Sequence, residues 1–343
     1  MLPKIIFIEI KKLIVINIIL KMKDLLSFKK KNYFILRIRS FKYIIIIVAI
    51  FLFEIIDFST SEIYIEPNSH YIFTFWEPRN SLPEYINLCI KTWKKYLPND
   101  YKIIVLDYNN LRYFLDYKLI NKILCKRMSL QVQSDAIRVA VLQKYGGIWM
   151  DSDTIITNSK CMNMLFGSDL IMFGSSKKKI IHIGFIYASK NSTILKAWLK
   201  GIIKRNKIFK QRLFLKNIFP IKKNIESFNE LITWNYLGNG ILNELVKNVS
   251  EKSFKIIERD DAYVLPEMYL QKDHFNNYQD FYFTANDPEP LLKKCKGILM
   301  LHNSWTEEKY QKMSKKEFLF QDIMLVRLFK RLLSNYTKLM DIK

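Results

Sequence analysis

The sequence predicts a mixed α/β domain over residues 59–343, and three observations support this fold class. Half of the 343 residues are hydrophobic and 14% are aromatic, which is enough to bury a substantial core. From residue 71 onward, short apolar runs alternate with segments of helical periodicity, as in α/β domains. Nine Gly and nine Pro are too few for a fibrous or proline-rich chain. No internal repeat is visible, so we expect a single domain with a more elaborate C-terminal half.

The first part of this domain shows the alternation most clearly. Pro83 stands where a helix begins, and apolar residues follow it three and four positions apart. Ser129 is a suitable N-cap for a helix that we expect to end at Gly146 and Gly147. The elements expected here are strands at 71–76, 102–106 and 148–150, and helices at 84–97, 111–127 and 130–144.

The second part is expected to add strands and helices of similar length. The segment 202–223 is strongly basic and has no clear period, so we interpret it as a surface insertion. The expected strands are 170–173, 181–188, 254–257, 281–284 and 298–302, and the expected helices are 193–205, 225–236, 241–249 and 315–333.

The net charge of +23 has several readings. A nucleic-acid partner, an anionic lipid surface or a phosphorylated substrate would each suit a basic protein. A nucleotide bias toward lysine codons would also produce it, because the lysines are spread along the chain.

Four widely spaced cysteines form no CxxC pair, which excludes a zinc module and a disulfide scaffold. We therefore expect thiols buried as small hydrophobic groups in a reducing, cytoplasmic compartment.

Residues 1–58 form a basic and apolar N-terminal extension. They hold eleven Lys/Arg and four acids, a net charge of +7, together with apolar runs at 13–20 and 43–53. Both runs are shorter than the ~20 residues that a spanning helix needs. The segment suits peripheral contact with the inner face of a membrane, held by apolar burial and anionic head groups. A signal-like segment without a cleavage site, or a true start at Met22, are the open alternatives.

The informative stretch is residues 134–154, SDAIRVAVLQKYGGIWMDSDT. Asp135 and Arg138 are three positions apart and share one face of the predicted helix, which we expect to be its exposed edge. Glycine permits a positive φ, so the Gly-Gly pair can turn the chain sharply into a strand. That strand ends in Asp151 and Asp153. Ligands commonly bind where strands of α/β sheets end.

Two carboxylates at this spacing can reach one divalent cation, directly or through water. Mg²⁺ and Mn²⁺ prefer oxygen ligands and typically combine one or two carboxylates with phosphate oxygens. Such an ion would neutralise the charge of a nucleoside diphosphate leaving group. An Asp-x-Asp pattern alone is weak, because a solvated turn has the same residues.

The stretch resembles the signature of glycosyltransferases with a DxD sugar-binding region, those of family 32 and the related capsular polysaccharide synthesis proteins. Further segments match in the same order along roughly residues 64–330. They are HYIFTFWEP, LPEYINLCIKTWKKYLPNDYKIIVLD, HIGFIYASKNSTILKAWL and LHNSWTEEKYQKMSKKEFL. The resemblance covers neither residues 1–58 nor the basic segment near 202–223.

This resemblance implies a GT-A-like fold, in which a Rossmann-like mixed sheet is flanked by helices and followed by a helical C-terminal part. It implies a hexosyltransferase that takes a nucleotide sugar, usually a UDP-sugar, and passes the sugar to a glycan or lipid-linked acceptor in surface polysaccharide synthesis. It further implies Mn²⁺ or Mg²⁺ and retention of anomeric configuration. The residues it assigns are Asp151, Asp153 and His302 to the metal, Arg138 to catalysis, and Trp76, Asp135, Arg138, Gly147, Ser304 and Trp305 to the donor.

Each of these assignments has an alternative that the sequence leaves open. Trp76 and Trp305 are also typical core residues, and His302 follows an apolar strand as a structural histidine does. His182 and Asn235 are candidates for the acceptor side. Among enzymes, a haloacid-dehalogenase-like phosphatase shares the MDSDTI pattern, with Asp151 as nucleophile. Among binding proteins, a nucleic-acid-binding protein fits the charge, although no helix-turn-helix, zinc finger or RNP-type motif is present.

Overall fold

We analysed a computed structural model of the chain. It describes residues 70–165, 167–175, 180–190, 192–218, 235–247, 249–250, 252–258, 274–295 and 297–334, which belong to one compact unit. The predicted extension 1–58 and nearly all of the predicted helix 225–236 lie outside the described residues, so the domain boundary stays a prediction. Within the described part, no helix is both long and apolar enough to cross a membrane.

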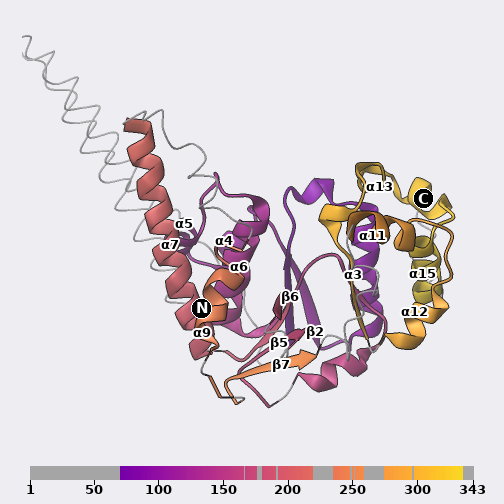
Figure 1. The fold of residues 1–343 in the computed structure, drawn as a ribbon, viewed down its shortest axis with the longest axis horizontal. Coiled ribbons are helices and arrows are strands. Elements are labelled where there is room, and N and C mark those ends of the chain that lie inside the picture. The colour runs from indigo at the N-terminus through magenta and orange to yellow at the C-terminus, as the bar shows by residue number, and fades with distance from the viewer. Residues whose placement is uncertain are drawn as a thin grey trace, which may run out of the picture. The chain divides into compact units, whose positions relative to one another are not determined.

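A six-stranded mixed sheet forms the centre of this unit (Figure 1). Its order is β2-β1-β3-β6-β5-β7, with β2, β1 and β3 parallel, β6 antiparallel to both neighbours, and β7 parallel to β5. A separate antiparallel pair joins β4 to β8. The strands are β1 His70–Phe75, β2 Tyr101–Leu106, β3 Gly147–Met150, β4 Thr154–Ile156, β5 Leu170–Ser175, β6 Ile180–Ala188, β7 Phe254–Glu258 and β8 Ile298–Met300.

Two groups of helices sandwich the sheet, as Figure 1 shows. One group is α4 Leu111–Phe114, α5 Tyr117–Ile123, α6 Leu130–Tyr145, α7 Thr193–Ile218 and α9 Asn239–Leu245. The other is α3 Glu84–Tyr96, α11 His274–Tyr282, α12 Glu289–Lys294, α13 Glu308–Lys312, α14 Lys315–Phe320 and α15 Met324–Leu333. Alternate strand residues face the two groups: Ile72 packs with α3 and the C-terminal helices, and Phe73 with α6. The expected fold class, a mixed sheet flanked by helices with a helical C-terminal part, is confirmed.

The elements around the Gly-Gly turn agree with the sequence prediction. The Ser129 hydroxyl accepts a hydrogen bond from the Val132 amide and caps α6. Gly146 and Gly147 have φ of 69° and 97°, values that favour glycine. A Cβ on Gly147 would lie 2.5 Å from the Tyr71 carbonyl oxygen, so the close pairing of β3 with β1 also requires glycine there.

Four predicted elements were wrong in extent or type. The helix 111–127 divides at Leu115, because Asp116 is extended and caps a new helix. The helix 315–333 also divides, into α14 and α15. The segment 281–284 is not a strand: Tyr278 and Tyr282, four residues apart, are both fully buried on α11. Aromatic residues favour strands, but here helical spacing decides which rings reach the core.

The basic segment at 202–223 is the fourth correction. Up to Ile218 it continues α7 as one 26-residue helix. The helix has an apolar face after all, since Trp198, Ile202 and Phe209 are buried at spacings of four and seven residues. Lysines fill the opposite face and mask that period in the sequence.

Candidate functional site

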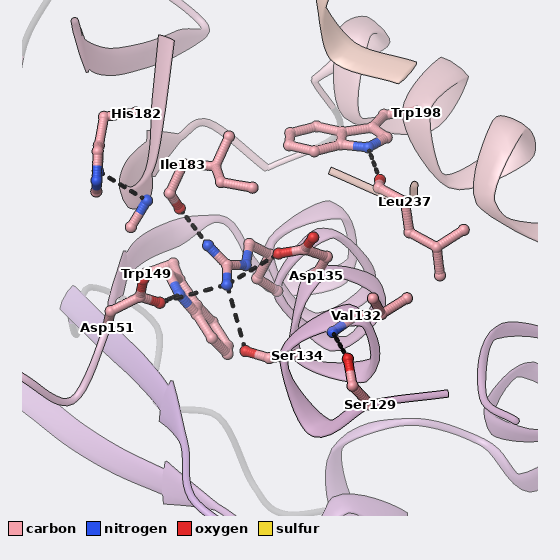
Figure 2. Close-up of polar contacts among 12 residues, drawn as sticks. Ser129, Val132, Ser134, Asp135, Trp149, Asp151, His182, Ile183, Trp198 and Leu237 are labelled. Atoms are coloured by element: carbon pink, nitrogen blue, oxygen red, sulfur yellow. Dashed lines mark hydrogen bonds and ion pairs between the residues drawn. The ribbon is translucent and has the colours of Figure 1, made fainter. Parts of the chain in front are cut away.

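The polar cluster of this protein is built around one arginine on α6 (Figure 2). Asp135 and Arg138 lie one helical turn apart, as predicted, but each is only 5% exposed. The expectation of an exposed helix edge was therefore wrong. The reason is that β6 and the turn before α9 cover this face of α6, which a helical pattern by itself does not reveal.

The Arg138 guanidinium is held on several sides. Its Nη2 lies 3.0 Å from Asp135 Oδ1 and 3.4 Å from Asp151 Oδ1, so one cation bridges two carboxylates. Its Nη1 donates to the Ile183 carbonyl oxygen at 2.5 Å, and its Cζ lies over the Trp149 ring, 5.1 Å from the ring centroid. Such a network fixes the side chain, because guanidinium geometry suits several simultaneous acceptors. The Nε–H remains buried without a hydrogen-bond partner among the described residues.

Asp151 lies where β3 ends and is anchored from β3 and β6. Its Oδ1 accepts from the Trp149 indole N–H at 2.8 Å, and its own amide donates to the Gly184 carbonyl oxygen at 2.7 Å. A Cβ on Gly184 would lie 2.7 Å from both Asp151 Oδ2 and His182 Cε1. Glycine at 184 thus lets β6 approach Asp151 closely. It also places His182 beside the cluster, with its Nδ1 accepting from the Gly184 amide.

A second glycine closes the other side of Asp135. A Cβ on Gly238, in the turn before α9, would lie 2.6 Å from Asp135 Oδ2. The turn is held by α7, whose Trp198 indole N–H donates to the Leu237 carbonyl oxygen at 2.7 Å. Asn239 donates from Nδ2 to the Ile181 carbonyl oxygen at 3.0 Å. Asn235 also lies in this turn but is exposed.

Asp153 belongs to a different set of contacts, made by the C-terminal segment. Its Oδ2 accepts from the Asn303 amide at 2.9 Å, and its carbonyl oxygen accepts from the Leu301 amide at 3.0 Å. The Tyr85 hydroxyl, from α3, donates to Asn303 Oδ1. The pairing of β4 with β8 continues these contacts and brings residues 301–305 beside Asp153.

The other C-terminal candidates form an aromatic group next to Asn303. The His302 and Trp305 rings lie 4.0 Å apart, and the Tyr278 ring meets both edge to face. Ser304 is exposed, and the other three residues of the segment His302–Trp305 are half-buried.

Two carboxyl groups, those of the buried Asp135 and the half-buried Asp153, have strongly raised pKa values. Burial raises the pKa of Asp135 to about 7, with Arg138 opposing the shift and Asp151 adding to it. Burial also raises the pKa of Asp153 to about 7, and the nearby Asp151 charge adds to the shift. Perturbed carboxyl groups of this kind are typical of functional sites.

Trp76 and Gly147 lie at opposite ends of the neighbouring strands. Phe73 of β1 pairs with Trp149 of β3, so Trp76 and Asp151 leave the sheet at the same edge. The Trp76 indole N–H is buried without a hydrogen-bond partner in the described part of the chain, as a donor that awaits a ligand would be. Gly147 begins β3, four residues before Asp151, and lies away from that edge.

The carboxylate pair fits a hard divalent cation. Asp151 Oδ2 receives no hydrogen bond from the described residues, and Asp153 is met by backbone amides rather than by a described Lys or Arg. Mg²⁺ and Mn²⁺ commonly use one or two carboxylates and complete their shell with phosphate and water. In the residues that the structure describes, no three His, Cys, Asp or Glu side chains are grouped as a metal site. The structure thus does not bring His302 together with both carboxylates.

Sequence reasoning missed several residues that complete the site. They are Tyr85, Trp149, Gly184 and Tyr278, and the contact of Gly238 with Asp135 was missed as well. Each lies on an element that tertiary packing brings to the cluster. Only Trp149 carries a local signal, because it is two residues from Asp151 on the same side of the strand.

One family of proteins matches this chain over more than half of its length. The model of the family described as capsular polysaccharide synthesis protein matches residues 28–219. This range contains Asp135, Arg138, Asp151 and Asp153. It begins inside the predicted extension 1–58, so part of that extension belongs to the family's sequence pattern. No curated protein matches the chain.

Several solved structures are similar over part of the chain. A glycosyltransferase involved in the glycosylation of the major capsid of PBCV-1 is 11% identical, over 71% of this chain and 100% of that one, with a TM-score of 0.35. The glycosyltransferase GlyE of Streptococcus pneumoniae TIGR4 is 13% identical, over 80% and 64%, with a TM-score of 0.35. The PaToxG glycosyltransferase is 18% identical, over 59% and 88%, with a TM-score of 0.31.

Proposed function

The chain belongs to the capsular polysaccharide synthesis protein family, and on that premise we propose that it is a glycosyltransferase with a GT-A-like fold. It moves a hexosyl unit from a nucleotide sugar, with UDP as the favoured nucleotide, to a glycan or lipid-linked acceptor. The observation that carries the proposal is the convergence of Asp135, Arg138 and Asp151 at one sheet edge, next to Asp153 and Trp76. Binding at this edge is usual for α/β sheets.

Asp151 and Asp153 would hold Mn²⁺ or Mg²⁺ in this proposal, with His302 as a further ligand only if it moves toward them. Such an ion would neutralise the negative charge of the diphosphate as this leaving group departs. Arg138 holds Asp151 in place and adds positive charge behind it. Because the guanidinium is fixed before substrate binds, it stabilises developing negative charge without reorganisation.

The remaining residues would hold the donor. The Trp76 ring offers an aromatic face and an unpaired N–H at the sheet edge, which suits a uracil base. Asp135 accepts hydrogen bonds from sugar hydroxyls, and Ser304 and Trp305 each donate a hydrogen bond to phosphate. Gly147 is left out of the proposed donor site, because it lies at the far end of β3. We name no general base, since retention of configuration does not require a dedicated one.

Binding of UDP tests this proposal most directly. Calorimetry with and without Mn²⁺ should show metal-dependent binding that is lost in Asp151→Asn/Asp153→Asn. The exposed Asp287→Asn variant is the matched control, and it should bind as the wild type does. Metal-independent binding, or binding unchanged in the double variant, would contradict the proposal. If UDP does not bind but GDP does, with the same metal dependence, only the choice of nucleotide changes.

We further propose that residues 1–58 hold the enzyme at a membrane, because they combine a net charge of +7 with two apolar runs. A truncation that removes them should lower membrane recovery at low salt and leave UDP binding intact. Loss of UDP binding in the truncated protein would instead assign the segment to the catalytic domain.

A further inference from the structure

The longest stretch of the sequence without an acidic residue falls in the middle of the described unit. Residues 170–225 contain no Asp or Glu in 56 positions and include 14 Lys or Arg. The whole chain has 32 acids in 343 residues, so about five would be expected in a stretch of this length. A general lysine bias does not account for the missing acids. The proposed glycosyl transfer uses none of these cations.

Helix α7 turns this composition into a surface. Its inner face is buried through Trp198, Ile202 and Phe209. At about 100° per residue, the exposed residues of the opposite side fall within one sector of roughly 120°. We call this sector the α7 outer face. It contains Lys196, Lys200, Lys204, Lys207, Ile208 and Phe214, together with the exposed Thr193, Ala197 and Gln211. From Lys196 to Phe214 it is ~27 Å long, at ~1.5 Å per residue.

The described cations of α7 differ in their contacts, and the exposed Arg212 lies outside the outer face. Arg205 and Lys210 lie at the flank and bond to backbone carbonyl oxygens of the unit, as Arg205 does to those of Tyr236 and Gly240. The four lysines of the outer face form no hydrogen bond or ion pair with a described residue. Their charge is therefore uncompensated within the described part of the chain.

Apolar side chains accompany these lysines in the open. Phe214 is 64% exposed and Ile208 is 37% exposed, on the same side of the helix as the lysines. A polyanion alone, such as nucleic acid, would not need them. A lipid surface uses both, because anionic head groups attract the lysines while the apolar groups enter the interface.

We propose that the α7 outer face binds an anionic lipid surface. The chain's own residues 1–58 are a poor occupant, since their net charge of +7 repels a row of lysines. The lipid contact is independent of the proposed chemistry. It would nevertheless act close to the site, because the inner face of α7 holds the turn that places Gly238 against Asp135.

Vesicle flotation of the full-length protein tests the inference. The vesicles are phosphatidylcholine alone, or phosphatidylcholine with about one-third phosphatidylglycerol. We expect the wild type to bind the anionic vesicles. The variant Lys200→Gln/Lys204→Gln/Lys207→Gln should partition onto them at least tenfold more weakly, because each lysine near such a surface increases the affinity roughly fivefold. The matched control is Lys94→Gln/Lys293→Gln/Lys294→Gln, on α3 and α12 at the other end of the unit in Figure 1.

A second variant separates lipid from other polyanions. Phe214→Ser should weaken partition into anionic vesicles severalfold but leave binding to a short DNA duplex unchanged. UDP binding in the presence of Mn²⁺ should be the same in all variants, which separates this inference from the proposed function. Equal losses in the α7 and control triple variants, no loss in the α7 variant, or a Phe214 variant that binds vesicles as the wild type does would each overturn the inference.

Discussion

Asp135 and Asp153 lie near the same sheet edge, and burial raises the pKa of each to about 7, yet their surroundings differ. Asp135 has a cation at 3.0 Å, the guanidinium of Arg138. Asp153 has the Asn303 amide and, among the described residues, no Lys or Arg in ion-pair contact. Asp135 is compensated by a direct ion pair, whereas Asp153 has backbone N–H dipoles in contact and the Arg138 charge acts on it without an ion pair.

This difference indicates which part of the site depends on a ligand. A buried carboxylate paired with an arginine is complete without substrate, so the Arg138 cluster contributes to the stability of the protein itself. A carboxylate without a direct ion pair, next to the second charge of Asp151, is stabilised by an added cation. We therefore expect the Arg138 cluster to dominate folding measurements and the Asp153 cluster to dominate metal and donor binding.

The largest effect is expected from Asp153→Asn. Loss of a charge-stabilising group at such a site costs about 10³-fold in turnover. At the same time the metal-free protein should unfold at an unchanged or higher temperature, because a charge that desolvation and Asp151 both destabilise is removed. Release of UDP from UDP-glucose or UDP-galactose measures the turnover. A thermal melt without metal measures the unfolding temperature. A clear fall in melting temperature would show that Asp153 contributes to folding stability, as we expect of the Arg138 cluster.

Arg138→Met is expected to give the largest change in stability. It leaves Asp135 and Asp151 without their shared cation, and breaking a buried pair in this way costs ~3–5 kcal/mol. Urea unfolding of the metal-free protein measures this loss in the free energy of unfolding. The double variant Arg138→Met/Asp135→Asn is the control, and it should recover part of the loss because one uncompensated carboxylate has been removed. A loss below ~1 kcal/mol in the single variant would mean that the cluster is not charge-compensated as we describe.

Tyr85→Phe addresses the Asp153 side at lower cost. The Tyr85 hydroxyl donates to the side chain of Asn303, and the backbone N–H of Asn303 binds Asp153. Removal of the hydroxyl should therefore lower the free energy of unfolding by ~1–2 kcal/mol and weaken Mn²⁺ binding severalfold. Tyr310→Phe is the control, since that buried tyrosine donates no hydrogen bond from its hydroxyl to a described residue. Unchanged Mn²⁺ affinity in Tyr85→Phe would separate the tyrosine from the metal site.

The smallest effect concerns pH. Because the pKa of Asp135 rises from 3.8 to about 7 on folding, the folded protein retains a proton that the unfolded chain releases. Its contribution to stability is therefore complete below pH ~4 and is lost as pH rises to ~7. The free energy of unfolding of the metal-free protein, measured in urea across this range, should fall less steeply in Asp135→Asn than in the wild type. Identical slopes of the free energy of unfolding against pH would show that folding does not raise the pKa of Asp135.

The central helix, turn and strand could be predicted from the sequence because their determinants are local. Ser129, the Gly146-Gly147 pair and the two aspartates lie within 25 residues, and capping, positive φ and helical period act over such distances. The C-terminal elements were harder. Aromatic composition at 281–284 favoured a strand, and only burial of Tyr278 and Tyr282 on one side shows a helix.

By itself the sequence determined that Asp135 and Arg138 share a helix face and that Asp151 and Asp153 follow a strand. Only the tertiary structure decided that Arg138 is buried between two carboxylates. It also decided that Asn303 binds Asp153 from 150 residues away along the chain, and that Tyr85 binds Asn303 from 218 residues away. The physical reason is that helical and strand periods fix which side chains point the same way. What lies opposite them depends on the packing of β6, the turn at Gly238 and the C-terminal segment, and no local pattern encodes that packing.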